Sequence, residues 1–313
     1  MTGGILVFRL GGLGDLLVTL PSLALLREAH PGAEFTLVCR ESYGLLLKEA
    51  GLTESVVPAD SSLLAGLYRD PAGKDPSLRR WLKSFATAWG WMSRESGAGL
   101  VRSLIESGAR NVRILDPPPA STSIPNYEHF LRETAKGIGR PSLSTEKIEE
   151  LSRLRLPGTA RGGMSSRSAP PVIIHPGSGG RDKCWPLERF LEIAGRLSAE
   201  GLEGILVTGE AEERLEPRLE ARPLPEGWSW LRRPVLSSLA EQLGRCRLYL
   251  GNDSGVTHLA AACGAPVLAL FKKENAVSWR PYGNVRVVSA VAVEDIKLED
   301  VWREIFSWKH AHG

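Results

Sequence analysis

The chain has 313 residues, of which 42% are hydrophobic and 24% charged, and its formal net charge is +3. This length accommodates two domains of ordinary size, and the small net charge gives no reason to expect nucleic-acid binding. No apolar run approaches the roughly 18 residues that cross a bilayer, and the first residues lack the pattern of a secretory signal. The four cysteines are Cys39, Cys184, Cys246 and Cys263. They have no CxxC spacing, which argues against a zinc site and indicates a reduced, cytoplasmic compartment.

A strand–turn–helix–strand pattern opens the chain. Residues 5–8 form a short apolar run, and a glycine-rich turn follows it. Residues 15–30 have leucines at three- and four-residue spacing, which predicts a helix, and another strand is predicted at residues 35–39. This unit indicates a parallel sheet with helices on its faces.

Basic residues dominate the stretch between Arg69 and Arg113. This stretch is a candidate surface for an anionic partner, and a solvated face without a partner is the alternative. Its nine basic residues are Arg69, Lys74, Arg79, Arg80, Lys83, Arg94, Arg102, Arg110 and Arg113, against the acids Asp70, Asp75, Glu95 and Glu106.

The second half of the chain repeats the pattern of the first. Residues 157–171 are rich in Pro, Gly and Ser, and they predict a linker between a first domain (1–156) and a second (172–296). The fold class predicted is α/β: two facing Rossmann-like domains with parallel sheets and a cleft between them. The elements predicted in the second half are strands at 172–175, 204–208, 248–250 and 267–271, and helices at 186–200 and up to residue 262.

The first glycine-rich turn reads Arg9-Leu10-Gly11-Gly12-Leu13-Gly14-Asp15. Glycines such as Gly12 and Gly14 allow a tight turn and leave backbone amides facing outward at a helix N-terminus, where anions bind. The turn is not a dinucleotide fingerprint, because Leu17 occupies the place of the third glycine in GxGxxG. Asp15 has two open roles: a general base on an incoming hydroxyl, or an ordinary helix cap.

The second motif is HPGSGGRDKCWP, residues 175–186. Its small residues, including Gly179, the hydroxyl of Ser178 and the amine of Lys183 precede a helix and form a candidate phosphate cradle. It is not a Walker A loop, because the GK[ST] ending is absent. Lys183 would neutralise charge on a departing diphosphate; a solvent-exposed lysine in a flexible loop is the alternative.

The third motif is GNDSGVTH, residues 251–258. It again places backbone amides at the start of a helix after a strand. Asp253 and Ser254 could hold a ligand or cap the helix. His258 lies about one turn into the helix, where it could reach the same cleft or simply pack.

In order and spacing these motifs resemble glycosyltransferase family 9, the ADP-heptose:lipopolysaccharide heptosyltransferases. The matching sequences are RLGGLGD, HPGSGGRDKCWP, TGEAEE and GNDSGVTHLAAACGAPVLALF, of which the last is the most specific. The resemblance implies a GT-B fold and inverting transfer of a sugar, with ADP-heptose as the favoured donor. It also implies a lipopolysaccharide-core or related glycan acceptor that is anionic and lipid-linked. No cofactor is expected, and the protein would work in the cytoplasm, with peripheral contact at the inner membrane.

The resemblance assigns roles to single residues. Asp15 corresponds to the proposed catalytic base, and Ser178 and Lys183 correspond to the loop on the phosphates of the nucleotide sugar. Glu213 fits the spacing of the ribose-binding acid better than Glu212.

The third motif corresponds to the family's Asp-Thr-Gly and His on the nucleotide and diphosphate. Here these residues are Asp253, Ser254, Gly255 and His258, with serine in place of the usual threonine. His258 and Lys183 would stabilise the leaving diphosphate. No Asp-x-Asp pair follows a strand, so a metal site is not expected.

Two other functions stay open. One is a hydrolysing, epimerase-like enzyme of the same architecture, which would release free sugar without an acceptor. The other is a non-catalytic relative that binds sugar nucleotides and tolerates the loss of Asp15.

Two further segments carry expectations. Trp81, Phe85, Ala88, Trp89 and Met92 follow helical spacing, which predicts either a basic, aromatic helix face that meets an anionic lipid-linked acceptor at the membrane surface or a core helix. Residues 297–313 predict an amphipathic helix, which the fold class implies crosses back onto the first domain.

Overall fold

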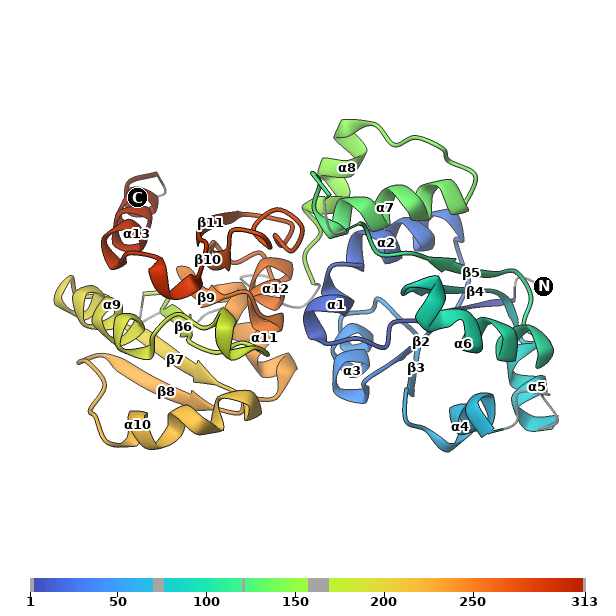
Figure 1. Ribbon diagram of the computed structural model, residues 1–313, viewed down its shortest axis with the longest axis horizontal. Helices are drawn as coiled ribbons and strands as arrows, with labels where there is room; N and C mark the ends of the chain where they lie inside the picture. Colours follow the sequence, from blue (N-terminus) through green and yellow to red (C-terminus); the bar gives the residue numbers. More distant parts are fainter. Residues whose placement is uncertain (1–2, 70–75, 120–121, 157–168, 312–313) are drawn as a thin grey trace. The chain divides into compact units, whose positions relative to one another are not determined.

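The computed structural model describes residues 3–69, 76–119, 122–156 and 169–311. The chain divides into two compact units, residues 1–154 and 155–313, each with one parallel β-sheet (Figure 1). Residues 157–168, most of the predicted linker, lie outside the described residues. Among the helices that are described, none is long and apolar enough to cross a membrane.

The first unit has a five-stranded sheet in the order β3-β2-β1-β4-β5. Its strands β1 and β2 are buried along nearly their whole length, because helices cover both faces of the sheet. One face packs against α4, α5 and α6, and on the other side α2 packs against α7 and α8. The strands are β1 (Gly4–Phe8), β2 (Phe35–Cys39), β3 (Ser55–Pro58), β4 (Phe85–Trp91) and β5 (Val112–Leu115). The helices are α1 (Leu13–Leu17), α2 (Leu20–Ala29), α3 (Glu41–Glu49), α4 (Ser62–Arg69), α5 (Pro76–Leu82), α6 (Arg94–Glu106), α7 (Asn126–Gly137) and α8 (Thr145–Ser152).

The helix predicted over residues 15–30 is two helices, α1 and α2, that meet at Val18 and Thr19. Pro21 stands at the start of α2. It has no N–H to donate to the carbonyl of Leu17, so it starts a new helix more readily than it continues an old one. The hydroxyl of Thr19 donates to the carbonyl of Leu16 over 2.7 Å.

The prediction of one helix through Trp81–Met92 is wrong. Trp81 lies in the last turn of helix α5, which ends at Leu82, whereas Phe85–Trp91 forms strand β4 beside β1. A strand buried on both faces has a nearly continuous apolar run, and such a run also satisfies helical spacing. Trp89 and Trp91 are core residues, and the indole of Trp91 donates to the hydroxyl of Thr134 over 3.1 Å.

The second unit has a six-stranded parallel sheet in the order β11-β10-β9-β6-β7-β8. Its strands are β6 (Val172–His175), β7 (Gly204–Thr208), β8 (Trp228–Arg232), β9 (Leu248–Asn252), β10 (Val267–Lys272) and β11 (Val285–Ala290). The helices are α9 (Leu187–Ala199), α10 (Glu216–Glu220), α11 (Leu236–Arg245), α12 (Gly255–Ala262) and α13 (Leu298–Ala311), with short 3-10 turns at Arg181–Lys183, Glu210–Leu215 and Val293–Asp295. The order reverses between β6 and β9, which places their carboxyl ends at the position where open α/β sheets bind ligands.

Helix α13 belongs to the core of the second unit, whereas the sequence predicted that it packs on the first domain. Val301 and Ile305 are buried in one cluster with Ile193 and Leu197 of α9. Arg196 adds an ion pair to Glu299 at 2.7 Å. The amphipathic pattern therefore predicted the helix correctly, and its buried side packs on α9 of its own unit.

We expect Trp89→Ala to destabilise the first unit by about 3–5 kcal/mol, the usual loss for a buried tryptophan, because Trp89 is only 2% exposed. Denaturant unfolding measures the loss. Val291→Ala, at a side chain that is 82% exposed, is the control and should change stability by less than about 0.5 kcal/mol. A Trp89→Ala protein as stable as the control would contradict the core assignment.

Candidate functional site

The glycine-rich turn after β1 folds the side chain of Asp15 back onto the turn. The N–H of Gly12 donates to Oδ2 of Asp15 over 2.8 Å, which caps helix α1. A Cβ at Gly11 would lie 2.6 Å from Cγ of Asp15, so only glycine leaves room for this carboxylate. Asp15 is still 35% exposed and can meet a ligand. The capping role is present in the structure, and it leaves the carboxylate accessible.

Arg9 is the partner of Asp15 that sequence reasoning missed. Its guanidinium is largely buried, and Nη2 lies 3.1 Å from Oδ1 of Asp15. Its Nε donates to the backbone carbonyl of Asp15 over 2.7 Å, and Nη1 donates to the carbonyl of Trp91. Burial lowers the pKa of Arg9, and the charge of Asp15 opposes that shift. Arg9 therefore fixes the loop to strand β4 and orients the carboxylate.

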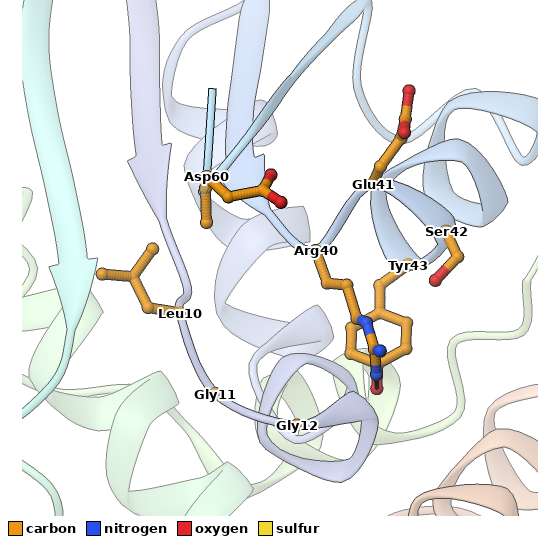
Figure 2. A pocket seen from close by; sticks show the side chains of 9 residues that line it. Leu10, Gly11, Gly12, Arg40, Glu41, Ser42, Tyr43 and Asp60 are labelled. Carbon is orange, nitrogen blue, oxygen red and sulfur yellow. Dashed lines mark hydrogen bonds between the residues drawn. The ribbon is translucent and has the colours of Figure 1, made fainter. Parts of the chain in front are cut away.

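A pocket of about 560 Å³ opens beside this turn, at the carboxyl ends of β1, β2 and β3. The side chain of Arg40 runs alongside the ring of Tyr43 in Figure 2, and Nη1 donates to the phenol oxygen over 3.3 Å. Asp60 stands across from them on the chain after β3. The lining combines apolar, aromatic and charged groups: Leu10, Gly11, Gly12, Arg40, Glu41, Ser42, Tyr43, Ala59 and Asp60.

The second and third motifs meet at Asp253. Nζ of Lys183 lies 2.9 Å from Oδ2 of Asp253, and the hydroxyl of Ser178 donates to its backbone carbonyl over 2.6 Å. Nδ2 of Asn275 donates to the same Oδ2 over 3.2 Å. Asn252 joins the two loops as well, since its amide donates to the carbonyl of Pro176 and accepts from the N–H of Trp185. Asn275 and Asn252 were not predicted from the sequence.

Helix α12 begins at this cluster. Ser254 caps it by accepting from the N–H of Thr257 over 3.3 Å, and Gly255 is its first residue. His258, one turn later, is buried, with its ring centroid 6.5 Å from that of Trp279. Gly179, by contrast, lies in an open part of the second motif, where an added Cβ would meet nothing within 4 Å.

The two acidic residues after β7 have different surroundings. Glu212 is buried: it accepts from the N–H of Gly209 over 2.8 Å, and its carboxylate lies 3.4 Å from Nε2 of His175. Gly177 is required here, because a Cβ at that position would collide with Glu212. Glu213 has a side chain that is 76% exposed, and its carboxylate lies 3.4 Å from Nη2 of Arg233. The buried carboxylate is engaged inside the unit, whereas the exposed one can meet a ligand.

Comparison with known proteins agrees with this geometry. The model of glycosyltransferase family 9 (heptosyltransferase) matches residues 128–301, which is more than half of the chain. The chain belongs to glycosyltransferase family 9. The family predicted from the sequence is therefore confirmed.

Two curated relatives show how far the likeness extends. Lipopolysaccharide heptosyltransferase 1 of Escherichia coli K12 is 22% identical over 323 aligned residues, which cover 93% of this chain and 95% of that protein. Lipopolysaccharide heptosyltransferase 3 of E. coli is 27% identical over 116 residues, which cover 36% of this chain and 34% of that protein. The second likeness is thus local.

Solved structures show that this family 9 chain has the GT-B fold. The glycosyltransferase family 9 protein of Veillonella parvula matches with a TM-score of 0.76 at 18% identity, over 98% of this chain and 97% of that one. The E. coli heptosyltransferase WaaC with ADP matches with a TM-score of 0.67 at 20% identity, over 97% and 99%. The predicted fold class is confirmed.

Electrostatics distinguish Glu212 within this family 9 site. Burial opposes ionisation, but the hydrogen bond and charge of His175 and the N–H of Gly209 outweigh it and lower the pKa of Glu212. Ionised Glu212 therefore stabilises the fold at pH values above its unfolded pKa of about 4.3. That stabilisation is lost as the pH falls through the lower folded pKa.

We expect Glu212→Gln to lower the free energy of unfolding by an amount that is constant above about pH 5 and shrinks toward pH 3. Denaturant unfolding of both proteins across this range measures the difference. Glu213→Gln, at the exposed neighbour, is the control and should run parallel to the unsubstituted protein. If the loss of unfolding free energy in Glu212→Gln instead grew as the pH falls, the pKa of Glu212 would not be lowered by folding.

Proposed function

We propose that this protein is an inverting glycosyltransferase that moves heptose from ADP-heptose onto a lipopolysaccharide-core or related glycan acceptor. The observation that supports this most directly is the cluster of Lys183, Ser178 and Asp253 at the carboxyl ends of β6 and β9. A cation, a hydroxyl and the amides at the start of α12 suit a diphosphate. Family membership and a structural neighbour that holds ADP support the choice of donor.

In the proposed complex the diphosphate lies between the second and third motifs. Lys183, which is 34% exposed, turns its amine toward the phosphates, and Ser178, Gly179, Ser254 and Gly255 line the loop around them. Glu213 binds the ribose hydroxyls, since its carboxylate reaches solvent while that of Glu212 is occupied. His258 lies one turn below, near the leaving oxygen.

Asp15 is the proposed general base. Its carboxylate takes the proton of the acceptor hydroxyl as the hydroxyl oxygen forms a bond to the anomeric carbon. The bond from that carbon to the diphosphate breaks on the opposite face, so the configuration inverts. Lys183, His258 and the N-terminus of α12 stabilise the charge that grows on the diphosphate. This reaction requires the loops of both units to face one cleft, which is part of the proposal.

The proposed acceptor site is the pocket beside Gly12. Tyr43 offers an aromatic face to a sugar, while Arg40 and Asp60 offer hydrogen bonds to its hydroxyl and acid groups. The acceptor in this proposal is an anionic, lipid-linked glycan. The protein would therefore work in the cytoplasm, in peripheral contact with the inner membrane.

We expect Asp15→Asn to lower kcat by about a hundredfold or more while donor affinity stays unchanged. Asparagine can still accept the bond from Gly12, so the turn keeps its cap. Steady-state transfer assays and calorimetry with ADP-heptose measure the two quantities. Asp295→Asn, at an exposed residue in the 3-10 turn before α13, is the control. Near-normal turnover with Asp15→Asn would remove this residue from the mechanism and favour a non-catalytic binder.

We expect Lys183→Met to weaken ADP binding by about 10- to 100-fold, because a charge-assisted hydrogen bond is lost. Adenosine, which lacks the diphosphate, should bind both proteins equally. Calorimetry with the two ligands separates a phosphate contact from a general disturbance of the site. Lys297→Met, at an exposed lysine before α13, is the matched control. An equal loss for adenosine would contradict the proposed role.

A further inference from the structure

A second hollow, of about 750 Å³, lies along the open edge of the first sheet and shares no lining residue with the pocket beside the first glycine-rich turn. Strand β5 is the last strand in the order β3-β2-β1-β4-β5, and both α6 and α7 contact it (Figure 1). Seven of the ten lining residues are apolar or glycine. The lining consists of Ala98, Val101, Arg102, Ile105, Glu106, Val112, Arg113, Ile114, Leu115 and Gly137.

One face of α6 forms a wall of this hollow. Ala98, Val101, Arg102 and Ile105 follow the spacing i, i+3, i+4 and i+7, which places them on one side of the helix. The opposite side of α6 is buried through Leu100 and Leu104. Ile105 is 56% exposed, although it is one of the largest apolar side chains of the helix. Helix α6 is therefore apolar toward the core and partly apolar toward solvent.

Basic side chains gather around the C-terminal end of α6. Arg79 of α5 reaches the carbonyl of Glu106 over 3.5 Å, and Cε of Lys83 lies close to Gly108. Arg102 and Arg113 belong to the lining itself. Within residues 76–115, the described side chains that are exposed and charged are two acids, Glu95 and Glu106, and six cations: Arg79, Arg80, Lys83, Arg102, Arg110 and Arg113. The surface is thus apolar in its groove and positive around it.

We propose that this groove and its basic rim bind anionic phospholipid at a membrane surface, with an acyl chain or glycerol region against Ile105 and headgroups on Arg102 and Arg110. The inference rests on the proposed function in that it identifies where the membrane contact is made. Charge complementarity selects this occupant, because basic residues beside apolar surface are what anionic membranes attract. An added peptide strand fits less well: β5 has four residues, and Arg113 stands in its middle, as in edges protected from pairing.

This contact lies on the same unit as the proposed catalytic turn. Strand β1 is two positions in from β5, with β4 between them. Neighbouring strands are about 4.8 Å apart, so β1 lies about 10 Å from β5 across the sheet. Along the strands, Lys83 and Arg110 precede β4 and β5, whereas Asp15 comes after the carboxyl end of β1.

Co-sedimentation with vesicles tests the proposal on the full chain. We expect binding to vesicles of 70% phosphatidylcholine and 30% phosphatidylglycerol at low salt, and weak binding to pure phosphatidylcholine. Each basic residue contributes roughly fivefold to partitioning onto an anionic surface, so Arg102→Glu with Arg110→Glu should reduce partitioning by about thirtyfold or more. Ile105→Asn tests the apolar part and should also reduce partitioning.

Matched controls carry equal changes elsewhere. Lys48→Glu with Lys297→Glu removes the same charge, and Val291→Asn alters an apolar side chain that is 82% exposed; both should bind as the unsubstituted protein does. No binding of the unsubstituted protein to anionic vesicles, or equal losses in variants and controls, would overturn the proposal. So would a dimer in sedimentation equilibrium that Ile105→Asn abolishes, since a second copy would then occupy the groove. Stabilisation by ADP-heptose, measured on the same proteins, reports on the proposed function independently.

Discussion

The second unit is organised around one buried carboxylate, that of Asp253. A charge removed from water must be compensated by partners close at hand, and these partners come from different loops. Lys183 lies on the loop after β6 and Asn275 on the chain after β10, while Ser178 binds the backbone carbonyl of Asp253 itself. Because all of these loops leave the same edge of a parallel sheet, one carboxylate can hold them in register. These contacts therefore hold the proposed donor site in place through the chain's own residues, as a preorganised site requires.

The first unit also has an ion pair with one buried and one accessible member, but with the opposite charges. There the buried member is a cation, Arg9, and the accessible member is the carboxylate of Asp15. Arg9 also donates from Nε and Nη1 to the carbonyls of Asp15 and Trp91. Turning away from the loop would leave these largely buried donors without their acceptors, which costs free energy. In each unit the buried partner fixes a group of opposite charge at the surface. The units thus present opposite charges, a carboxylate in the first and an ammonium group in the second. These are the charges that the proposed mechanism needs in its general base and in the group beside the departing diphosphate.

Sequence reasoning succeeded where local pattern decides structure. The strands at 172–175 and 204–208 coincide with β6 and β7, because short apolar runs between glycine-rich or proline-rich turns are typical of buried parallel strands. It failed at Phe85–Trp91, where a strand buried on both faces has no alternation to distinguish it from a helix. It also missed Pro21 as a helix start within an otherwise continuous leucine pattern.

The candidate site shows the same division between local and long-range information. Motif spacing singled out Lys183, Ser178 and Asp253, and the structure brings them together. Arg9, Asn252 and Asn275 were missed because their roles come from contacts across the fold: Arg9 binds Trp91, 82 positions along the chain, and Asn252 binds Trp185, 67 positions away. The spacing of residues along one sequence does not show which distant residues contact each other in the fold. The one signal for Arg9 was a charged residue placed directly after a buried strand.

In the proposed complex the diphosphate lies close to the carboxylate of Asp253. Bringing this anion next to Asp253 sets like charges against each other, which costs free energy at short distance. Lys183 cannot serve both anions fully unless it stays between them, and its partial exposure lets it do so. Asn275 then retains its bond to Asp253 without any change of charge, since an amide donates irrespective of what Lys183 does. In the proposed complex Asn275 therefore keeps its hydrogen bond to the carboxylate while Lys183 turns toward the diphosphate, so the proposal requires no rearrangement of these loops.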